Sequence, residues 1–151
     1  MQTTNIHEVT RPDQTLTNTL NRLLPQLTPD AKTLSLNDVK AITKSGGSHL
    51  YIMETGGETI GTYTLCVYDS PTGRKVWLED VIVDNRYRGK GLGQRLVAHA
   101  MNEAKRFAPC TLMLTSRPSR IAANALYQAS GMERKETNVY KKVLVSGKLL
   151  V

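Results

Sequence analysis

Residues 84–98 read DNRYRGKGLGQRLVA, a glycine-rich turn that follows an apolar run and leads into a helix pattern. Gly89, Gly91 and Gly93 lack a Cβ, so their backbone can adopt positive φ and bring several N–H groups together around an anion. The helix expected over residues 91–107 adds unpaired N–H donors and the positive end of its dipole. The turn therefore predicts a binding site for a diphosphate.

The spacing of the glycines separates this turn from two common nucleotide-binding motifs. A P-loop requires Gly-x-x-x-x-Gly-Lys followed by Ser or Thr, and no hydroxyl residue follows the turn here. A dinucleotide fingerprint requires Gly-x-Gly-x-x-Gly and an acidic residue about 20 residues further on, whereas the next acidic residue, Glu103, lies inside the expected helix. The remaining alternative is a glycine-rich turn that binds no ligand.

The pattern Arg88-x-x-Gly91-x-Gly93 resembles the pyrophosphate-binding motif of the GNAT superfamily of N-acetyltransferases, Gln/Arg-x-x-Gly-x-Gly/Ala, which binds acetyl-CoA. Upstream, residues 76–84 (VWLEDVIVD) are similar to the central strand of that family, which carries acidic residues partway along. Downstream, residues 117–143 (RPSRIAANALYQASGMERKETNVYKKV) resemble its closing half. The three segments follow the order of the family and cover about the C-terminal half of the chain.

The resemblance implies a single domain over residues 1–151 with a mixed α/β (α+β) fold. Its central sheet is expected to be mostly antiparallel, splayed at the acetyl-CoA site and flanked by about four helices. Asn85 stands where Pro is frequent in the family, and Met132 stands where Phe usually follows the glycine. Both changes are conservative for the fold, and the splay itself has no signature in the sequence.

Punctuation and hydrophobic periodicity predict the order of the elements. Apolar runs between turn residues predict strands over residues 6–10, 49–55, 58–69, 76–84 and 110–116, and a last strand or strand pair over residues 133–145. Apolar residues at helical spacing predict helices over residues 14–24, 35–44, 91–107 and 121–130. Pro25 is expected to end the first helix, Ser35 or Asn37 to cap the second, and Gly56-Gly57 to turn a hairpin.

The positive charge of the chain is concentrated around the glycine-rich turn. The formal net charge is +7; residues 1–75 carry seven basic and seven acidic residues, and residues 76–151 carry thirteen and six. Arg86, Arg88 and Lys90 bring mobile cations to the turn, where they would attract CoA. Nucleic acid is the alternative partner of a basic chain. One Phe, one Trp and the lack of a known binding motif argue against nucleic acid.

The sequence also bounds location and metal binding. No segment approaches the roughly 18 apolar residues of a membrane span, and the first residues lack a signal-peptide core, so a cytoplasmic protein without membrane association is expected. Cys66 and Cys110 lie in apolar runs and are expected to be buried free thiols. Two cysteines without a histidine cluster do not make a zinc site, so no metal is expected. The oligomeric state is left open, with a homodimer as one arrangement.

Acetyl transfer to an amine requires a base, because an alkylamine with a pKa near 10.4 is protonated at neutral pH. Glu79 and Asp80 interrupt an apolar strand, where burial raises the pKa of a carboxyl group. Consecutive strand residues face opposite ways, so at most one of the two is expected to face the acetyl site. By its position in the motif, Glu79 resembles the catalytic glutamate of the family. Asp80, a water chain, or a purely structural role for both carboxylates are the alternatives.

The departing thiolate leaves more easily if it is protonated, and Tyr127 is the candidate acid. Packing of its ring against the sheet is the alternative role. Asn124 lies three residues earlier on the same helix face. In the family, the matching Asn bonds the pantetheine arm, the matching Tyr lies near the sulfur, and backbone N–H groups near Ile82 and Val83 serve the thioester oxygen. The expected cofactor-binding residues are Ile82, Val83, Arg88, Gly89, Lys90, Gly91, Leu92, Gly93, Gln94, Asn124 and Tyr127.

The resemblance thus implies an N-acetyltransferase (an acyltransferase) that moves the acetyl group of acetyl-CoA directly to a primary amine. Direct transfer is favoured because neither cysteine sits at a helix N-terminus or in a motif that would lower its pKa. The acceptor is not determined, and small metabolites, amino-sugar drugs, peptide N-termini and lysine side chains all remain open. The alternative function is a non-catalytic acetyl-CoA-binding sensor or regulatory module.

Overall fold

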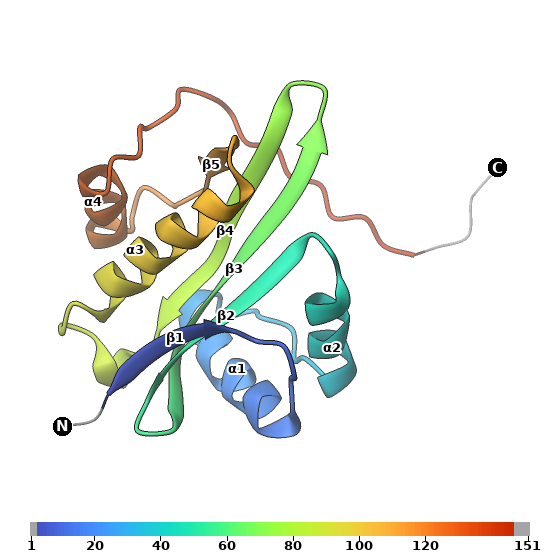
Figure 1. The fold of residues 1–151 in the computed structure, drawn as a ribbon, viewed down its shortest axis with the longest axis vertical. Coiled ribbons are helices and arrows are strands. Elements are labelled where there is room, and N and C mark those ends of the chain that lie inside the picture. Colours follow the sequence, from blue (N-terminus) through green and yellow to red (C-terminus); the bar gives the residue numbers. More distant parts are fainter. Residues whose placement is uncertain (1–2, 147–151) are drawn as a thin grey trace.

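The computed structural model describes residues 3–146 and consists of a five-stranded sheet with helices on both faces (Figure 1). The strand order is β1-β2-β3-β4-β5, antiparallel except for the parallel pair β4–β5. The strands are β1 (Thr4–Glu8), β2 (Ser48–Thr55), β3 (Glu58–Ser70), β4 (Gly73–Val83) and β5 (Thr111–Met113). The helices are α1 (Gln14–Leu27), α2 (Leu36–Lys44), α3 (Leu92–Ala104) and α4 (Ile121–Ala129). The expected mixed α/β class and mostly antiparallel sheet are confirmed.

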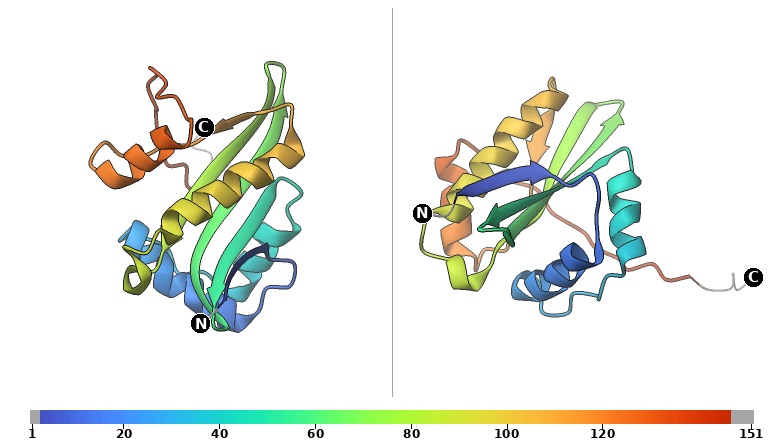
Figure 2. Two further views of the ribbon diagram at one scale, coloured as in Figure 1. Left: turned by 60° about the vertical axis from the view of Figure 1, so that its left-hand side comes forward. Right: turned by 60° about the horizontal axis from the view of Figure 1, so that its bottom comes forward.

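Helices α1 and α2 cover one face of the sheet and α3 covers the other (Figure 2). Successive side chains of β2 point to opposite faces of the sheet, because side chains alternate along a strand. Leu50 and Ile52 pack with α1 and α2, whereas Tyr51 and Met53 pack in the core under α3. In residues 3–146, no helix is long and apolar enough to cross a membrane.

Helix α1 continues to Leu27 and therefore passes through Pro25, contrary to the expectation that the proline ends it. A proline near the end of a helix removes one N–H donor, and contacts from other segments can outweigh that loss. Here the Oε1 atom of Gln26 accepts a hydrogen bond from the Asn85 N–H at 2.8 Å. The Arg117 guanidinium donates to the Leu27 carbonyl at 3.2 Å. The last turn of α1 is thus held by the segments that surround it.

The expected turn and cap residues have their predicted roles around α2 and β2. Ser35 caps α2: its hydroxyl accepts from the Asp38 N–H at 3.1 Å, and the Asp38 carboxylate accepts from the Ser35 N–H at 2.8 Å. Gly56 and Gly57, with φ of 55° and 79°, turn the chain from β2 into β3. These local signals were sufficient because each is satisfied within a few residues.

The prediction of strands over residues 133–145 is wrong for this structure. Residues 133–146 form no helix or strand, and every one of them is exposed. In the views of Figures 1 and 2 the segment passes the sheet, and its last described part extends away from the body of the molecule. The fifth strand, too, is shorter than expected, so Cys110 lies outside it; Cys66 and Cys110 are free and only half-buried. An apolar, β-branched run forms a strand only where a neighbouring strand supplies hydrogen-bond partners.

Candidate functional site

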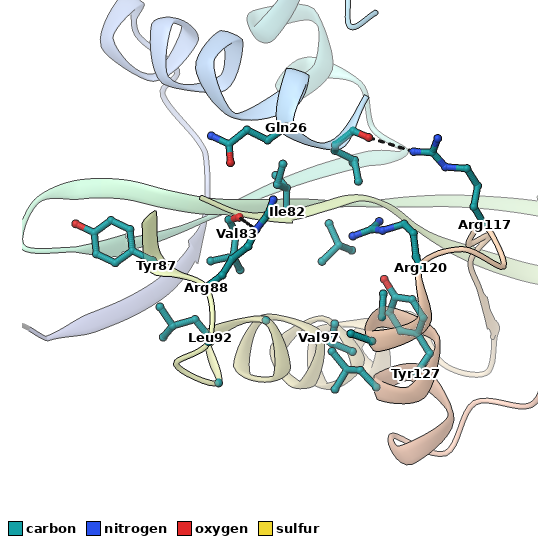
Figure 3. Close-up of a pocket in the computed structure, with 18 of the residues that line it drawn as sticks. Gln26, Ile82, Val83, Tyr87, Arg88, Leu92, Val97, Arg117, Arg120 and Tyr127 are labelled. Carbon is teal, nitrogen blue, oxygen red and sulfur yellow. Dashed lines mark hydrogen bonds between the residues drawn. The ribbon is translucent and has the colours of Figure 1, made fainter. Parts of the chain in front are cut away.

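A cleft of about 570 Å³ opens between β4 and α4, beside the glycine-rich turn (Figure 3). The end of α1, the end of β4, the start of α3, the β5–α4 loop and α4 itself contribute to its walls. The expected cofactor-binding residues that line it are Ile82, Val83, Arg88, Gly89, Gly91, Leu92, Gly93 and Tyr127. The fold therefore brings Tyr127 next to a turn more than thirty positions earlier in the sequence.

Strand β4 loses its neighbour on one side before it reaches the cleft. It pairs with β5 only from Lys75 to Trp77, whereas its other edge stays paired with β3 as far as Val83. Among residues 3–146, the edge of β4 that faces β5 consequently has no strand partner over residues 78–83. Residues 81–83 of this edge line the cleft. The sheet is therefore splayed next to the glycine-rich turn, as the resemblance implied.

A bulge at Asp80 changes the direction of the side chains along β4. The register with β3 shifts between Thr62 and Thr64, and Asp80 adopts a φ of 51°, in the left-handed region. Side chains packed against the α3 core have even numbers before the bulge and odd numbers after it; they are Val76, Leu78, Val81 and Val83. The expected strict alternation at Glu79 and Asp80 is therefore broken, and alternation cannot decide which carboxylate faces the site.

Both carboxyl groups at the bulge have raised pKa values. Burial is the main cause for Glu79, and the negative charge of Asp80 raises the pKa of Glu79 further. Burial also raises the pKa of the Asp80 carboxyl. In the described part of the chain neither carboxylate forms an ion pair with Arg, Lys or His. Glu79 does not line the cleft; it precedes Ile82 by three positions on the same strand.

The glycine-rich turn has the backbone geometry of an anion site. Gly89 and Gly91 have φ of 78° and 74°, and Gly91 is the N-cap of α3 without a side-chain hydrogen bond to the helix. Gly93 differs from the expectation, because it lies in the first turn of α3 and its φ is not positive. Apart from its chain neighbours and the backbone of its own helix, a Cβ at Gly93 would meet no atom of residues 3–146 within 4 Å. The protein itself therefore does not require glycine at this position.

The three cations expected to be mobile at the turn differ in their contacts. The Lys90 ammonium lies 5.4 Å from the centre of the Tyr87 ring, and Arg88 Nε donates to the Val83 carbonyl at 3.2 Å. Arg86 instead binds Asp84 Oδ2 through Nη2 at 2.9 Å and also contacts the carboxylate of Glu58. The expectation of a mobile cation is therefore wrong for Arg86, because two carboxylates hold it.

The family of the protein follows from a comparison with known sequences and structures. The sequence profile described as the acetyltransferase (GNAT) family matches residues 15–132. The chain belongs to the acetyltransferase (GNAT) family. No curated protein sequence matches this acetyltransferase significantly.

Solved structures agree in fold at low sequence identity. An aminoglycoside N-acetyltransferase in complex with CoA is 19% identical, with a TM-score of 0.76 over 95% of this chain and 96% of that one. Glucosamine-6-phosphate N-acetyltransferase from Arabidopsis thaliana is 22% identical, with a TM-score of 0.76 over 93% and 98%. A transcriptional regulator from Bacillus halodurans C-125 is 20% identical, with a TM-score of 0.77 over 93% and 100%. At such identities the likeness establishes the fold of this acetyltransferase.

Asn124 and Tyr127 of the acetyltransferase lie on α4 but differ in their surroundings. Tyr127 lines the cleft; burial raises the pKa of its phenol, and the nearby Arg120 opposes that rise (Figure 3). Asn124 is not a lining residue, because its Nδ2 atom donates to the carbonyls of Arg117 and Arg120, each at 2.9 Å. The Asn124 side chain thus shapes the loop that carries the two arginines.

Sequence reasoning placed some site residues differently and missed others. Of the expected cofactor-binding residues, Lys90, Gln94 and Asn124 are not among the lining residues of the cleft. Arg117 and Arg120 do line it, although neither was expected to bind the cofactor. Both belong to the basic excess of the C-terminal half, which was the available signal.

A buried carboxylate that sequence reasoning did not select anchors the start of the turn. Asp84 is fully buried and accepts hydrogen bonds from Arg22 Nη1 at 2.6 Å and from Arg86 Nε at 3.1 Å. Burial alone would raise the pKa of Asp84, but the two arginines outweigh it and hold this pKa well below the usual range. Asp84 therefore ties α1 to the turn from which α3 begins.

Proposed function

We propose that the protein transfers the acetyl group of acetyl-CoA directly to a primary amine. The observation that carries the proposal is the unpaired edge of β4 at residues 78–83, which reaches the same cleft as the glycine-rich turn. Acetyl-CoA has two matching parts: a pantetheine arm whose amides can pair with a strand edge, and a pyrophosphate that accepts backbone N–H donors. In this proposal the arm lies along β4, and the pyrophosphate lies at the N-terminus of α3.

The open space at Gly93 supports a diphosphate at this position. Glycine costs roughly 0.5–1 kcal/mol relative to alanine inside a helix, and no atom in the described part of the chain would clash with a Cβ here. An external group that approaches the backbone gives a reason for glycine in a helical turn. The proposed contacts to the pyrophosphate come from the backbone of the turn and from nearby side chains; the residues are Arg88, Gly89, Lys90, Gly91, Leu92, Gly93 and Gln94. Asn124 and Tyr127 are proposed to contact the arm.

The chemistry begins with the acceptor, whose ammonium form must lose a proton. Glu79 takes that proton, directly or through water, and its raised pKa brings its basicity closer to neutral pH. The free amine nitrogen attacks the thioester carbonyl, and the backbone N–H groups near Ile82 and Val83 donate to the carbonyl oxygen as it becomes negative. The C–N bond forms, the C–S bond breaks, and Tyr127 gives its proton to the departing thiolate. The amine nitrogen loses its second proton as the amide forms, and that proton restores the phenol of Tyr127, directly or through water. Asp80 is the alternative base, because the bulge leaves both carboxylates near this point of β4.

Binding of the cosubstrate is tested by calorimetry with acetyl-CoA over a range of salt concentrations. Affinity should fall as salt rises, because phosphate groups meet cations near the protein surface. Gly91→Asp should abolish binding, since it adds a side chain and a negative charge at a φ of 74°. Gly57→Asp is the matched control, because Gly57 also has a left-handed φ and open space around it but lies outside the cleft. Equal binding by both variants would remove the turn from the proposal.

Catalysis is tested by the release of free CoA in the presence of different amines. Aminoglycosides and glucosamine 6-phosphate are the first to test, because structural neighbours are named for them. Peptide N-termini, lysine peptides and polyamines follow. Release of CoA with an amine, together with the acetylated amine in the mass spectrum, would establish the transfer. Tight binding of acetyl-CoA without release by any amine would favour a binding module.

A further inference from the structure

The charged side chains that line the cleft beside β4 are all arginines. Arg88, Arg117 and Arg120 line it, and no Asp or Glu of residues 3–146 is a lining residue. Arg88 belongs to the glycine-rich turn, where the proposed pyrophosphate lies. Arg117 and Arg120 come from the loop between β5 and α4. The proposed function therefore uses the charge of Arg88 and gives no role to the charges of Arg117 and Arg120.

The described part of the chain does not neutralise these two charges. Neither guanidinium forms an ion pair with a carboxylate of residues 3–146. Arg117 donates only to the carbonyl of Leu27, which carries no net charge. Arg120 immediately precedes α4, whose first turn contains no acidic residue, so this cation lies at the positive end of the helix dipole. The arrangement is unfavourable for the protein alone, and a bound anion would relieve it.

The loop that carries both arginines is held in one conformation. The Arg120 N–H donates to the Arg117 carbonyl at 3.0 Å, which closes a turn and keeps the two Cα atoms within about 7 Å of each other. The side chain of Asn124 donates to the same carbonyl and to that of Arg120, each at 2.9 Å. Arg117 also connects the loop to the end of α1. The two guanidinium groups are thus preorganised to bind one ligand together.

Arg120 lies at the end of the cleft where the acetyl group of the proposed cosubstrate is expected. Its charge acts on the phenol of Tyr127, so the two groups are close to each other. Figure 3 shows both at one end of the cleft, with Tyr87 and Leu92 of the turn region at the other end. In acetyl-CoA the pyrophosphate separates the sulfur from the 3′-phosphate. With the sulfur at Tyr127 and the pyrophosphate at the turn, the 3′-phosphate lies beyond the turn, away from Arg120.

We propose that Arg117 and Arg120 bind an oxyanion, a carboxylate or a phosphate, that is part of the acceptor amine. The inference rests on the proposed function and names its substrate class: a primary amine that also carries a negative charge. Guanidinium groups suit this role, because their paired N–H donors match both carboxylate and phosphate oxygens. An acceptor with several ammonium groups would instead meet arginines and no carboxylate in this cleft.

The first experiment measures the binding of radiolabelled inorganic phosphate to the full-length protein by equilibrium dialysis, with CoA at saturation. CoA fills the pyrophosphate site, so the phosphate probe should bind at the two arginines. Arg120→Gln and Arg117→Gln should each weaken phosphate binding by roughly tenfold or more and leave CoA binding almost unchanged. No phosphate binding by the CoA-saturated wild type, or equal binding by wild type and both variants, would overturn the proposal.

Arg95→Gln is the matched control for both substitutions. Like Arg117, Arg95 donates to a backbone carbonyl at 3.2 Å, here that of Thr4, and it forms no ion pair within residues 3–146. It lies on α3 outside the cleft. This variant should bind phosphate as the wild type does. A loss as large as that in Arg120→Gln would show that total charge, rather than the two cleft arginines, controls phosphate binding, and would overturn the proposal.

A second experiment tests whether Arg120 serves CoA itself. Calorimetry compares CoA with 3′-dephospho-CoA in the wild type and in Arg120→Gln. The substitution should change the affinity for both ligands little and equally. A loss confined to CoA would assign Arg120 to the 3′-phosphate and overturn the proposal. A wild type that binds neither ligand would instead overturn the proposed function, and this inference with it.

The amine screen provides the third test. For any acceptor that it identifies, removal of the anionic group, by amidation of a carboxylate or loss of a phosphate, should raise KM by roughly tenfold or more in the wild type. The same removal should have little effect in Arg120→Gln, because the charge that recognises the anion is already absent. An acceptor without an anionic group would overturn the proposal while confirming the acetyl transfer.

Discussion

The two helices that flank the cleft are held in different ways. Helix α3 buries four side chains, whereas α4 buries none. The turn that leads into α3 is anchored by the fully buried Asp84, whereas α4 stands between the three-residue β5 and the exposed segment 133–146. The α3 side of the cleft is therefore formed by the chain itself. In our proposal the α4 side gains further contacts from the cosubstrate that binds in the cleft.

The largest expected effect is that of a substitution at the bulge of β4, which lies on the α3 side of the cleft. Glu79→Gln should lower kcat by roughly 10²–10⁴-fold with little change in the affinity for acetyl-CoA, because it removes the base and keeps the shape. The limb of the pH profile at which activity rises should move to higher pH, since the amine must then lose its proton unaided. Steady-state kinetics with calorimetry measures both quantities. Asp80→Asn is the control, and a loss in this variant alone would assign the base to Asp80.

On the α4 side, Tyr127→Phe should lower kcat by roughly 10- to 10³-fold if the phenol protonates the thiolate. The melting temperature should hardly change, because Phe keeps the ring and α4 contributes little to the core. Rates and thermal melts of the two proteins test this together. A variant that melts several degrees lower and keeps its full rate would instead assign a packing role to Tyr127.

Asp84→Asn should lower the stability of the protein, because Asp84 anchors the turn on the α3 side of the cleft. Loss of the charge-assisted hydrogen bonds with Arg22 and Arg86 should cost about 2 kcal/mol of unfolding free energy. The native pKa of Asp84 is lowered, so its stabilisation is complete above the unfolded value of about 4 and is lost as the pH falls below it. Urea unfolding at pH 7 and pH 3 should show a gap between wild type and variant that narrows at pH 3.

The matched control for Asp84 is the exposed carboxylate of Asp69, which pairs with Arg74 at 2.8 Å. Its side chain is 69% exposed, and solvent-exposed ion pairs contribute at most about 1 kcal/mol. Asp69→Asn should therefore change the unfolding free energy much less than Asp84→Asn. Equal losses in the two variants would show that burial of Asp84 does not matter for the anchoring of the turn.

The smallest expected effect separates stability from binding at Gly93. Gly93→Ala should raise the unfolding free energy by about 0.4–1 kcal/mol, because the backbone is helical and the Cβ has open space among the described residues. The same change should weaken acetyl-CoA binding, since the Cβ enters the proposed pyrophosphate space. Gly46→Ala is the control, because Gly46 also has open space but lies in the turn between α2 and β2. Unchanged binding in Gly93→Ala would place the pyrophosphate elsewhere.

The sequence alone was sufficient for features that depend on neighbouring residues. The cap at Ser35, the Gly56-Gly57 hairpin and the left-handed glycines 89 and 91 follow from local hydrogen bonds and backbone freedom. Motif spacing also placed seven of the lining residues, between Ile82 and Gly93, because a strand, a turn and a helix in direct succession leave little choice of geometry. The extent of α1 past Pro25 was not predictable, since contacts from Asn85 and Arg117 decide it.

Only the tertiary structure decided the features that arise where distant segments meet. The bulge at Asp80 and the divergence of β4 from β5 depend on pairing with β3 and β5, and they overrode the simple alternation expected at Glu79. Asp84 became an anchor because Arg22, sixty-two positions earlier, packs against it. Residues 133–145 have the composition of a strand, yet they form none, and β5 is the last strand of the sheet in residues 3–146. Propensity is a property of the segment, whereas hydrogen-bond partners are supplied by the fold.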